Sequence, residues 1–209
     1  MYRISLTVAL ACIIGLAASA GAAPTIDGTV VGDEYDAVLT DTTESGPLYE
    51  GGLDIDQVFF AADDDYLYVG LSVKEPALDR NGEDTSVSES TVFVLNLSDE
   101  ESDTPLGQMQ VIMYDSAAMG VFFQPGSLFT PDWSTQEGDD LKIADALEVR
   151  IPKTELGEFG DTLSVFGQLD GTGFGHDDQV TGTVTIPEPT TMALLATVGA
   201  GMLLRRRRR

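Results

Sequence analysis

Apolar and polar residues alternate over short stretches in the middle of the chain, and no long stretch has apolar residues at helical spacing. Runs rich in β-branched and aromatic residues are separated by Gly, Asp, Asn and Pro, which is the pattern of β-strands joined by turns. We expect strands at 57–62, 66–73, 91–97, 108–114, 120–123, 146–151, 162–169 and 179–186.

Three stretches add detail to this pattern. Tyr66–Val73 is the clearest strand, because the polar run Asp63–Asp65 before it forms a tight turn. Val92–Leu95 is apolar at every position, which predicts a central strand covered on both faces. Pro152–Leu156 is predicted to form one helical turn. Eight short strands with polar turns predict an all-β fold, a single two-sheet β-sandwich of jelly-roll type over residues 25–185.

The start of the chain has the features of a secretory signal peptide. Arg3 supplies a positive charge, Ile4–Leu16 is apolar, and Ala18–Ala23 is a run of small residues. We therefore expect signal peptidase to remove residues 1–22. The only cysteine, Cys12, would leave with them. The mature protein would then contain no thiol and would depend on core packing alone.

The end of the chain carries three features in a fixed order. The triplet Pro187, Glu188 and Pro189 stays extended, because each proline fixes φ and lacks an N–H group. An uncharged apolar run follows up to Leu204, and Arg205, Arg206, Arg207, Arg208 and Arg209 come last. An apolar run followed by arginines is typical of a membrane segment whose basic end stays in the cytoplasm. As a helix, the run reaches about 22 Å against a hydrocarbon core of about 30 Å.

In this order of features, residues 186–209 strongly resemble the PEP-CTERM sorting signal of Gram-negative bacteria. The resemblance implies that an integral-membrane exosortase recognises the tripeptide and removes the tail. The protein would be anchored only transiently in the inner membrane and then pass to the cell surface or extracellular matrix. Such proteins occur in bacteria that make exopolysaccharide and biofilm matrix. The alternative is a plain C-terminal tail anchor.

Charge restricts the possible partners of the chain. The formal net charge is −24, from 35 acidic and 11 basic residues. Six of the basic residues, Arg3 and Arg205–Arg209, lie at the two ends, whereas all 35 acidic residues lie between Pro24 and Pro189; that stretch therefore has five basic and 35 acidic residues, a net charge of −30. This charge repels nucleic acid and anionic membrane surfaces, so nucleic acid is excluded as a partner. Solubility, binding of divalent cations and dispersal by mutual repulsion remain possible roles for the acidic residues.

The central region resembles the β-sandwich of family-nine carbohydrate-binding modules and their DOMON-like relatives. The resemblance rests on six short motifs, one of which has Tyr35 where the family usually carries tryptophan. They are Thr25–Gly28, Gly32–Tyr35, Asp63–Val73, Leu147–Pro152, Glu155–Gly157 and Val165–Asp170. The resemblance implies a β-sandwich and a contact with carbohydrate, so extracellular polysaccharide is an expected partner.

Four aromatic residues are candidates for stacking on sugar rings. Trp133, the only tryptophan, lies in a segment with the composition of a loop, where an exposed indole could pack against the C–H face of a pyranose. Tyr35, Tyr49 and Phe174 are the other three. For each of the four, the alternative is packing within or at the rim of the sandwich.

Clusters of acidic residues are candidates for binding calcium, because Ca²⁺ takes six to eight oxygen ligands. For each cluster the alternative is a solvated turn, since none has the spacing of a calcium loop. The candidate ligands are Asp63, Asp64, Asp65, Asp79, Glu83, Asp84, Asp177 and Asp178. Calcium is therefore a possible cofactor, which would stabilise the folded domain.

Catalysis has little support in the sequence. His176 is the only histidine, and with no mature cysteine the chain lacks the residues for His- and Cys-based zinc sites or a Cys-His dyad. No Gly-x-Ser-x-Gly motif is present. We therefore expect a non-catalytic surface protein that associates with exopolysaccharide. The alternatives are a calcium-bridged structural or adhesive protein without a sugar site and a polysaccharide-modifying enzyme.

Overall fold

The computed structural model describes residues 23–42, 54–74, 91–114, 117–127, 130–170 and 176–186. These residues form eleven strands and one short helix. In chain order they are β1 (Ala37–Thr40), β2 (Ile55–Ala62), β3 (Tyr66–Val73), β4 (Thr91–Asp99), β5 (Thr104–Tyr114), β6 (Ala117–Phe123), β7 (Trp133–Gln136), β8 (Leu141–Ile143), β9 (Leu147–Pro152), α2 (Lys153–Leu156), β10 (Thr162–Asp170) and β11 (His176–Thr185).

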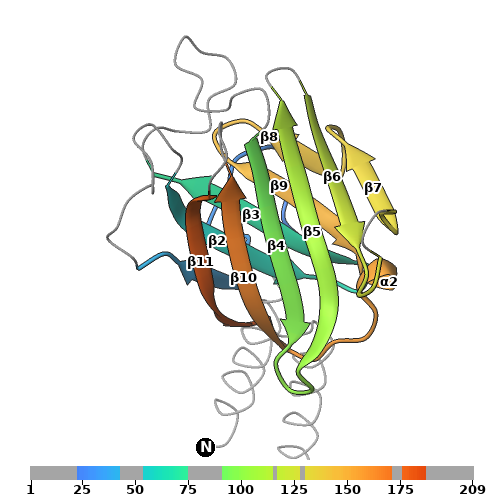
Figure 1. The fold of residues 1–209 in the computed structure, drawn as a ribbon. Helices are drawn as coiled ribbons and strands as arrows, with labels where there is room; N and C mark the ends of the chain where they lie inside the picture. The colour runs from blue at the N-terminus through green and yellow to red at the C-terminus, as the bar shows by residue number, and fades with distance from the viewer. Residues whose placement is uncertain are drawn as a thin grey trace, which may run out of the picture.

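The strands form two antiparallel sheets that pack face to face (Figure 1). The five-stranded sheet has the order β1-β2-β3-β9-β8, and the six-stranded sheet in front of it has the order β11-β10-β4-β5-β6-β7. This arrangement confirms the predicted all-β, two-sheet sandwich. Gly182 of β11 lies against the Leu39 side chain of β1, where the two sheets meet along one edge.

The core fills the space between the sheets. Alternate residues of each strand point inward, as a period of two requires. Phe60, Leu67 and Leu71 come from the five-stranded sheet, and Phe93 and Met109 from the six-stranded sheet; all five are fully buried. One continuous cluster of aliphatic and aromatic side chains therefore holds the two sheets together without any thiol.

All eight predicted strands are present, and the helical turn after Pro152 is present as α2. Three short strands, β1, β7 and β8, were not predicted, because runs of three or four residues have too few positions for alternation to register. The prediction that both faces of β4 are covered is wrong. Only its inward residues are buried, whereas Val92 and Val94 on the outer face are half-buried.

The segment 24–36 packs on the outer face of the five-stranded sheet. Ile26, Val30 and Tyr35 contact Phe59 and Tyr68 there, forming a second, smaller apolar cluster. The rings of Tyr35 and Phe59 lie 5.6 Å apart in a tilted arrangement. Val30 and Tyr35 also lie directly over Gly70 of β3, where a side chain would collide with both. The outer face of this sheet is therefore largely covered by the chain itself.

A buried carboxylate fastens this segment to the sheet. Glu148 of β9 is fully buried, and its Oε2 accepts hydrogen bonds from the backbone N–H groups of Asp27 (2.9 Å) and Gly28 (2.8 Å). Its Oε1 accepts a hydrogen bond of 2.7 Å from the Tyr35 hydroxyl. Gly28 has φ of +85°, and a Cβ there would lie 2.7 Å from the backbone nitrogen of Ala144. We call this set of contacts the N-terminal clip.

None of the helices within the described residues is long and apolar enough to cross a membrane. The expected signal peptide, residues 1–22, and the Pro-Glu-Pro triplet, apolar run and arginines of the tail lie outside the described residues.

Candidate functional site

The outer face of the six-stranded sheet is exposed over part of its area. Strand register places Val94 and Asn96 of β4, Gln108 and Gln110 of β5, and Phe123 of β6 on this face. All five side chains are partly exposed, whereas their inward neighbours are buried. Phe166 of β10, which lies opposite Asn96, is 37% exposed. The face thus combines side-chain amides with accessible aromatic rings.

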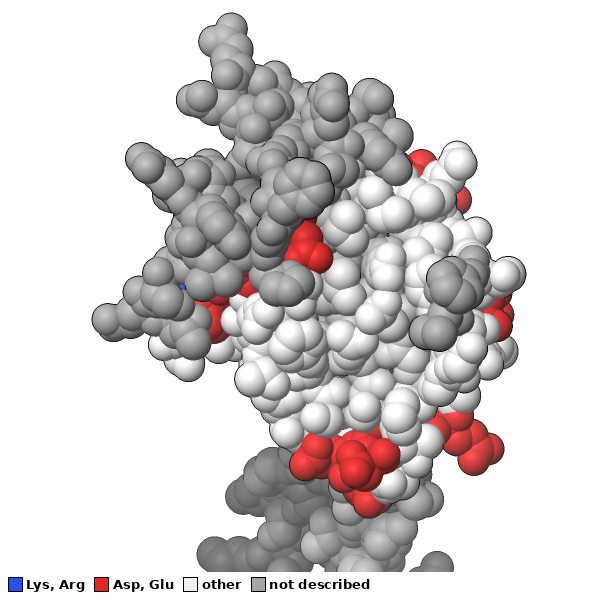
Figure 2. All heavy atoms as spheres, viewed as in Figure 1, with Lys and Arg blue, Asp and Glu red and all other residues white. Residues whose placement is uncertain are grey.

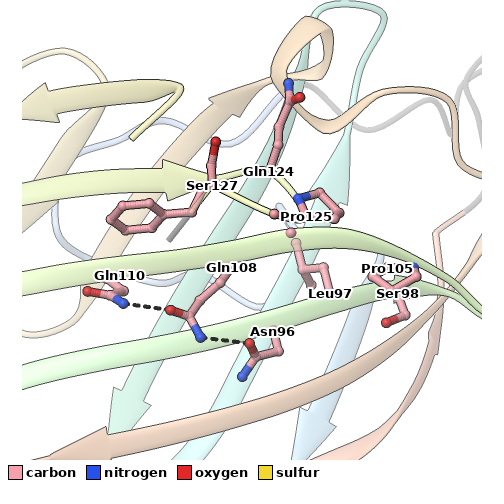
Figure 3. A pocket seen from close by; sticks show the side chains of 12 residues that line it. Asn96, Leu97, Ser98, Pro105, Gln108, Gln110, Gln124, Pro125 and Ser127 are labelled. Carbon is pink, nitrogen blue, oxygen red and sulfur yellow. Dashed lines mark hydrogen bonds between the residues drawn. The ribbon is translucent and has the colours of Figure 1, made fainter. Parts of the chain in front are cut away.

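Three amides on this face form a hydrogen-bonded ladder (Figure 3). The Nε2 of Gln110 donates to the Oε1 of Gln108 (2.6 Å), and the Nε2 of Gln108 donates to the Oδ1 of Asn96 (2.8 Å). The Oε1 of Gln110 and the Nδ2 of Asn96 have no hydrogen-bond partner within the described chain, so the ladder ends in an acceptor and a donor. Mutual hydrogen bonding fixes the orientation of the amides before any ligand arrives.

A groove of about 360 Å³ lies over the ladder. The amides Asn96, Gln108 and Gln110 line it on one side, and Pro125 lies across from them (Figure 3). Phe123 is a further lining residue, and together with Pro125 it supplies the apolar wall of the groove. Gly107 lies in the groove at a β-bulge between β4 and β5 and has φ of +146°. We call this feature the amide groove. Its combination of apolar wall and fixed polar groups is typical of small-molecule and oligosaccharide sites.

The amide groove carries no charge, although the chain as a whole has a net charge of −24. Figure 2 shows an uncharged expanse over the front sheet, with acidic residues gathered at its lower end, where the β4–β5 turn lies in Figure 1. Among the described positions on the outer face of this sheet, Asp170 at the end of β10 is the one carboxylate. Its oxygens accept hydrogen bonds from Gln168.

A second polar cluster lies at one end of the sandwich, away from the amide groove. Asp41, Asp54 and Asp178 are buried, and each has a carboxylate oxygen within 4.8 Å of the others. The Nζ of Lys74 lies 3.0 Å from Asp54 and 3.4 Å from Asp41, and Asp178 accepts a hydrogen bond from the N–H of Ile55 (2.8 Å). Lys74 thus bridges two of the three carboxylates, and the cluster keeps an excess of negative charge of the kind that oxygen ligands offer to a divalent cation.

The Asp178→Asn variant should be more stable than the wild type at pH 7. Burial raises the pKa of Asp178, and Asp41 and Asp54 add to the rise, while the N–H groups of Gln179 and Ile55 oppose it. The carboxyl group of Asp178 therefore binds a proton more tightly in the folded state than in the unfolded chain. The stability that Asp178 contributes is full below its unfolded pKa and is lost as the pH rises through its folded pKa. Melting temperatures measured from pH 3 to pH 8 should show the gap between variant and wild type closing in acid.

The exposed Asp64→Asn substitution is the matched control for this series. Repeating the pH 7 measurement with excess calcium and with excess chelator tests the predicted calcium site. A wild-type melting temperature that is equal in both would contradict calcium binding. A rise with calcium that Asp178→Asn abolishes would place the ion at this cluster.

The predicted sugar-stacking residues fall in different places. Tyr35 is 7% exposed and belongs to the N-terminal clip, so its ring has no open face for a sugar. We expected Trp133 to lie in a loop, but it is the first residue of β7 and lies opposite Phe122. Its half-buried indole packs against the core beside Gly120. Tyr49 and Phe174 lie outside the described residues.

The predicted metal ligands are also dispersed. Asp63 uses its carboxylate within its own turn, where Oδ1 accepts the N–H groups of Asp65 and Tyr66 and Oδ2 accepts the Tyr68 hydroxyl. Burial alone would raise the pKa of Asp63, but these hydrogen bonds lower it below its ordinary value. Asp64 and Asp65 are exposed. Asp79, Glu83 and Asp84 lie outside the described residues, and so does the side chain of Asp177, leaving Asp178 as the predicted ligand within the buried cluster.

The amide groove was not predicted from the sequence. The signal available was the alternation Gln108-Met109-Gln110-Val111, which places two amides on one face of a strand. Asn96 and Phe166 join that face only through strand pairing, and the sequence does not state which strands are neighbours.

Comparison with known proteins gives two kinds of match. The PEP-CTERM protein-sorting motif matches residues 185–209. No curated protein sequence matches the chain. Two solved structures of a family-nine carbohydrate-binding module from Caldicellulosiruptor kristjanssonii are similar, one in complex with glucose (16% identity, TM-score 0.33, 83% of this chain and 86% of that one). The other, in complex with cellotriose, has 17% identity and a TM-score of 0.34, covering 83% of this chain and 84% of that one.

The predicted resemblances to a sorting motif and to these modules are thus confirmed. The motif implies an exported protein that transits the membrane and is sorted to the cell surface by exosortase.

Proposed function

We propose that this protein is a non-catalytic surface protein of a Gram-negative bacterium, sorted by exosortase, which binds extracellular polysaccharide through the amide groove. The observation that carries the proposal is the ladder of Asn96, Gln108 and Gln110 beneath an apolar wall on an open sheet face. Sugars offer hydroxyl groups that both donate and accept, and side-chain amides do the same. Sugars also offer apolar C–H faces, which pack on aromatic rings such as that of Phe123.

The asymmetry between the two sheets supports this location. The outer face of the five-stranded sheet is occupied by the segment 24–36, whereas the outer face of the six-stranded sheet is partly exposed. The three amides of the ladder are held by each other rather than by charged partners, so few strong interactions have to be broken when a ligand binds to them. A preorganised, uncharged and accessible surface is suited to binding, and no carboxylate, histidine or lysine lines the groove to act as a general base.

The Gln108→Ala variant should lose most of its affinity for polysaccharide. Gln108 is the central member of the ladder, so its removal takes away its own contacts and releases both neighbouring amides. We expect a loss of at least about tenfold, which corresponds to about 1.4 kcal/mol. Binding is measured on a glycan array and then by calorimetry with the best glycan.

Two further variants separate binding from folding. Gln57→Ala removes an amide from the other sheet, where Gln57 donates to Thr40, and should leave binding unchanged. Trp133→Ala should lower the melting temperature through lost packing and leave binding intact. If glycan binding disappears in Trp133→Ala without loss of stability, the indole rather than the amide groove is the platform. Calcium-dependent self-association with no glycan bound would support the calcium-bridged alternative, and turnover of a glycan would support an enzyme.

A further inference from the structure

We propose that the amide groove selects an uncharged polysaccharide whose chain lies across the strands, along a row of four side chains from β10 to β6. The proposal rests on the function proposed above and specifies the class and direction of its ligand. The row is defined by strand register. Phe166 lies opposite Asn96, Asn96 opposite Gln108, and Gln108 opposite Phe123. We call these four residues the cross-strand row.

The composition of the cross-strand row suits a chain of sugars. An aromatic ring stands at each end, and two hydrogen-bonded amides lie between the rings. Adjacent strands lie about 4.8 Å apart, so the two rings are separated by about 14 Å across three strand spacings. That distance matches a short run of extended sugar units and exceeds a single ring. A polysaccharide lying along the row would place a C–H face on each phenylalanine and its hydroxyl groups over the amides.

The direction of the bound polysaccharide relative to the strands follows from the exposure of the Phe166 and Phe123 rings. Phe166 is one of three large apolar side chains that are clearly exposed in the described part of the chain, at 37%. Phe123 forms part of the groove wall and is half-buried. A ligand along β5 would contact Gln108 and Gln110 but only one of the two rings. A ligand across the strands contacts both rings and both central amides, and so buries more apolar surface.

Charge identifies the class of polysaccharide. No lining residue of the groove is charged, so an anionic glycan finds no cation to pair with there, while the net charge of −24 repels it. A cationic glycan finds no carboxylate within the groove, and Asp170 lies beyond it at the end of β10. An uncharged glycan loses no ionic hydration on binding and meets neither obstacle. The same repulsion opposes a second copy of this chain as the occupant, since both copies carry the same large negative charge.

The test uses the purified protein with three kinds of polymer: neutral glucans, mannans and galactans, a polyuronate, and chitosan. Binding is measured by calorimetry at 20 mM and 500 mM sodium chloride. We expect a neutral polymer to bind with an affinity that changes less than twofold between the two salt concentrations, because no ion pairs form. Binding of the polyuronate or chitosan at low salt with equal or greater affinity would overturn the inference while leaving polysaccharide binding itself in place.

The direction of the chain is tested with oligosaccharides of increasing length from the neutral polymer that binds. For the wild type, affinity should rise until the oligosaccharide reaches both rings. Phe166→Ala should weaken binding of the long oligosaccharides about tenfold and leave the shortest unchanged. The matched control is Val38→Ala, which removes an exposed apolar side chain from β1 in the other sheet.

Each remaining outcome also decides between the proposals. If Gln108→Ala abolishes binding and Phe166→Ala has no effect at any length, the groove binds polysaccharide but not across the strands. If no polymer binds at either salt concentration, the proposed function itself fails. If the wild type self-associates and Phe166→Ala prevents this, the face is an interface between copies of the chain, and both proposals are wrong.

Discussion

The Glu148→Ala variant should be less stable than the wild type by about 3–5 kcal/mol, the largest effect expected of any single substitution in the N-terminal clip. The side chain is fully buried and accepts three hydrogen bonds, from the N–H groups of Asp27 and Gly28 and from the Tyr35 hydroxyl. Alanine leaves all three donors without an acceptor beneath the segment 24–36. For a domain of this size the melting temperature should fall by roughly 10 °C.

Glu148→Gln is the matched control. The glutamine oxygen can accept both backbone N–H groups, and its amide nitrogen can donate to the Tyr35 oxygen, so each polar group keeps a partner. Only the charge is lost, and a decrease of about 1–2 kcal/mol is expected. Chemical denaturation measures both differences. Equal stability of the alanine and glutamine variants would show that the clip does not depend on these hydrogen bonds.

The Gly107→Ala variant should lose about 3 kcal/mol of stability and also distort the amide groove. A Cβ at this position would lie 2.4 Å from the Phe122 ring and 2.5 Å from the backbone oxygen of Phe123. The ring is fully buried and the oxygen belongs to the backbone of β6, so neither can move away easily. In addition, φ of +146° is a conformation that alanine rarely adopts. Stability is measured by thermal denaturation, and groove integrity by glycan binding at a temperature at which the variant remains folded.

Gly126→Ala is the control that separates the cost of a strained backbone conformation from the cost of a steric collision. Gly126 also lines the amide groove and has φ of +94°, but a Cβ there would meet nothing within 4 Å. We therefore expect a cost of only about 1 kcal/mol, from the backbone conformation alone. If the two variants lose equal stability, the contacts of Gly107 with β6 contribute nothing, and the argument for a sterically required glycine at the bulge fails.

The sequence predicted the positions of the strands better than it predicted which strands pair within each sheet. Alternation in Tyr66–Val73 and in the other long runs is a local property, which is why eight strands were found. The order β11-β10-β4-β5-β6-β7 depends on pairings between strands far apart in the chain, which local patterns do not encode. The apolar run Val92–Leu95 illustrates the limit. Its composition suggested cover on both faces, but valines are also accommodated at half-buried positions of an outer face.

The candidate site was harder to predict for a related reason. Aromatic and acidic residues were chosen by type, and the two that the structure places most clearly, Tyr35 and Asp63, use their polar groups within the fold. Tyr35 and Glu148 meet although 113 positions separate them, and the motifs that carry them therefore proved to be structural. None of the three amides of the groove stands out in the sequence by itself. They form a candidate site only because strand pairing places them side by side on one face, where they bond to each other.

The N-terminal clip has a consequence for how the polypeptide reaches its native state. Asp27 and Gly28 come from the beginning of the folded region, yet their acceptor, Glu148, follows 121 and 120 positions later. Because a polypeptide is synthesised from its N-terminus, the leading segment cannot dock until most of the molecule has been made. Contacts between such distant residues also slow folding. Attachment of the segment 24–36 is therefore a late step in folding, which follows the formation of β9.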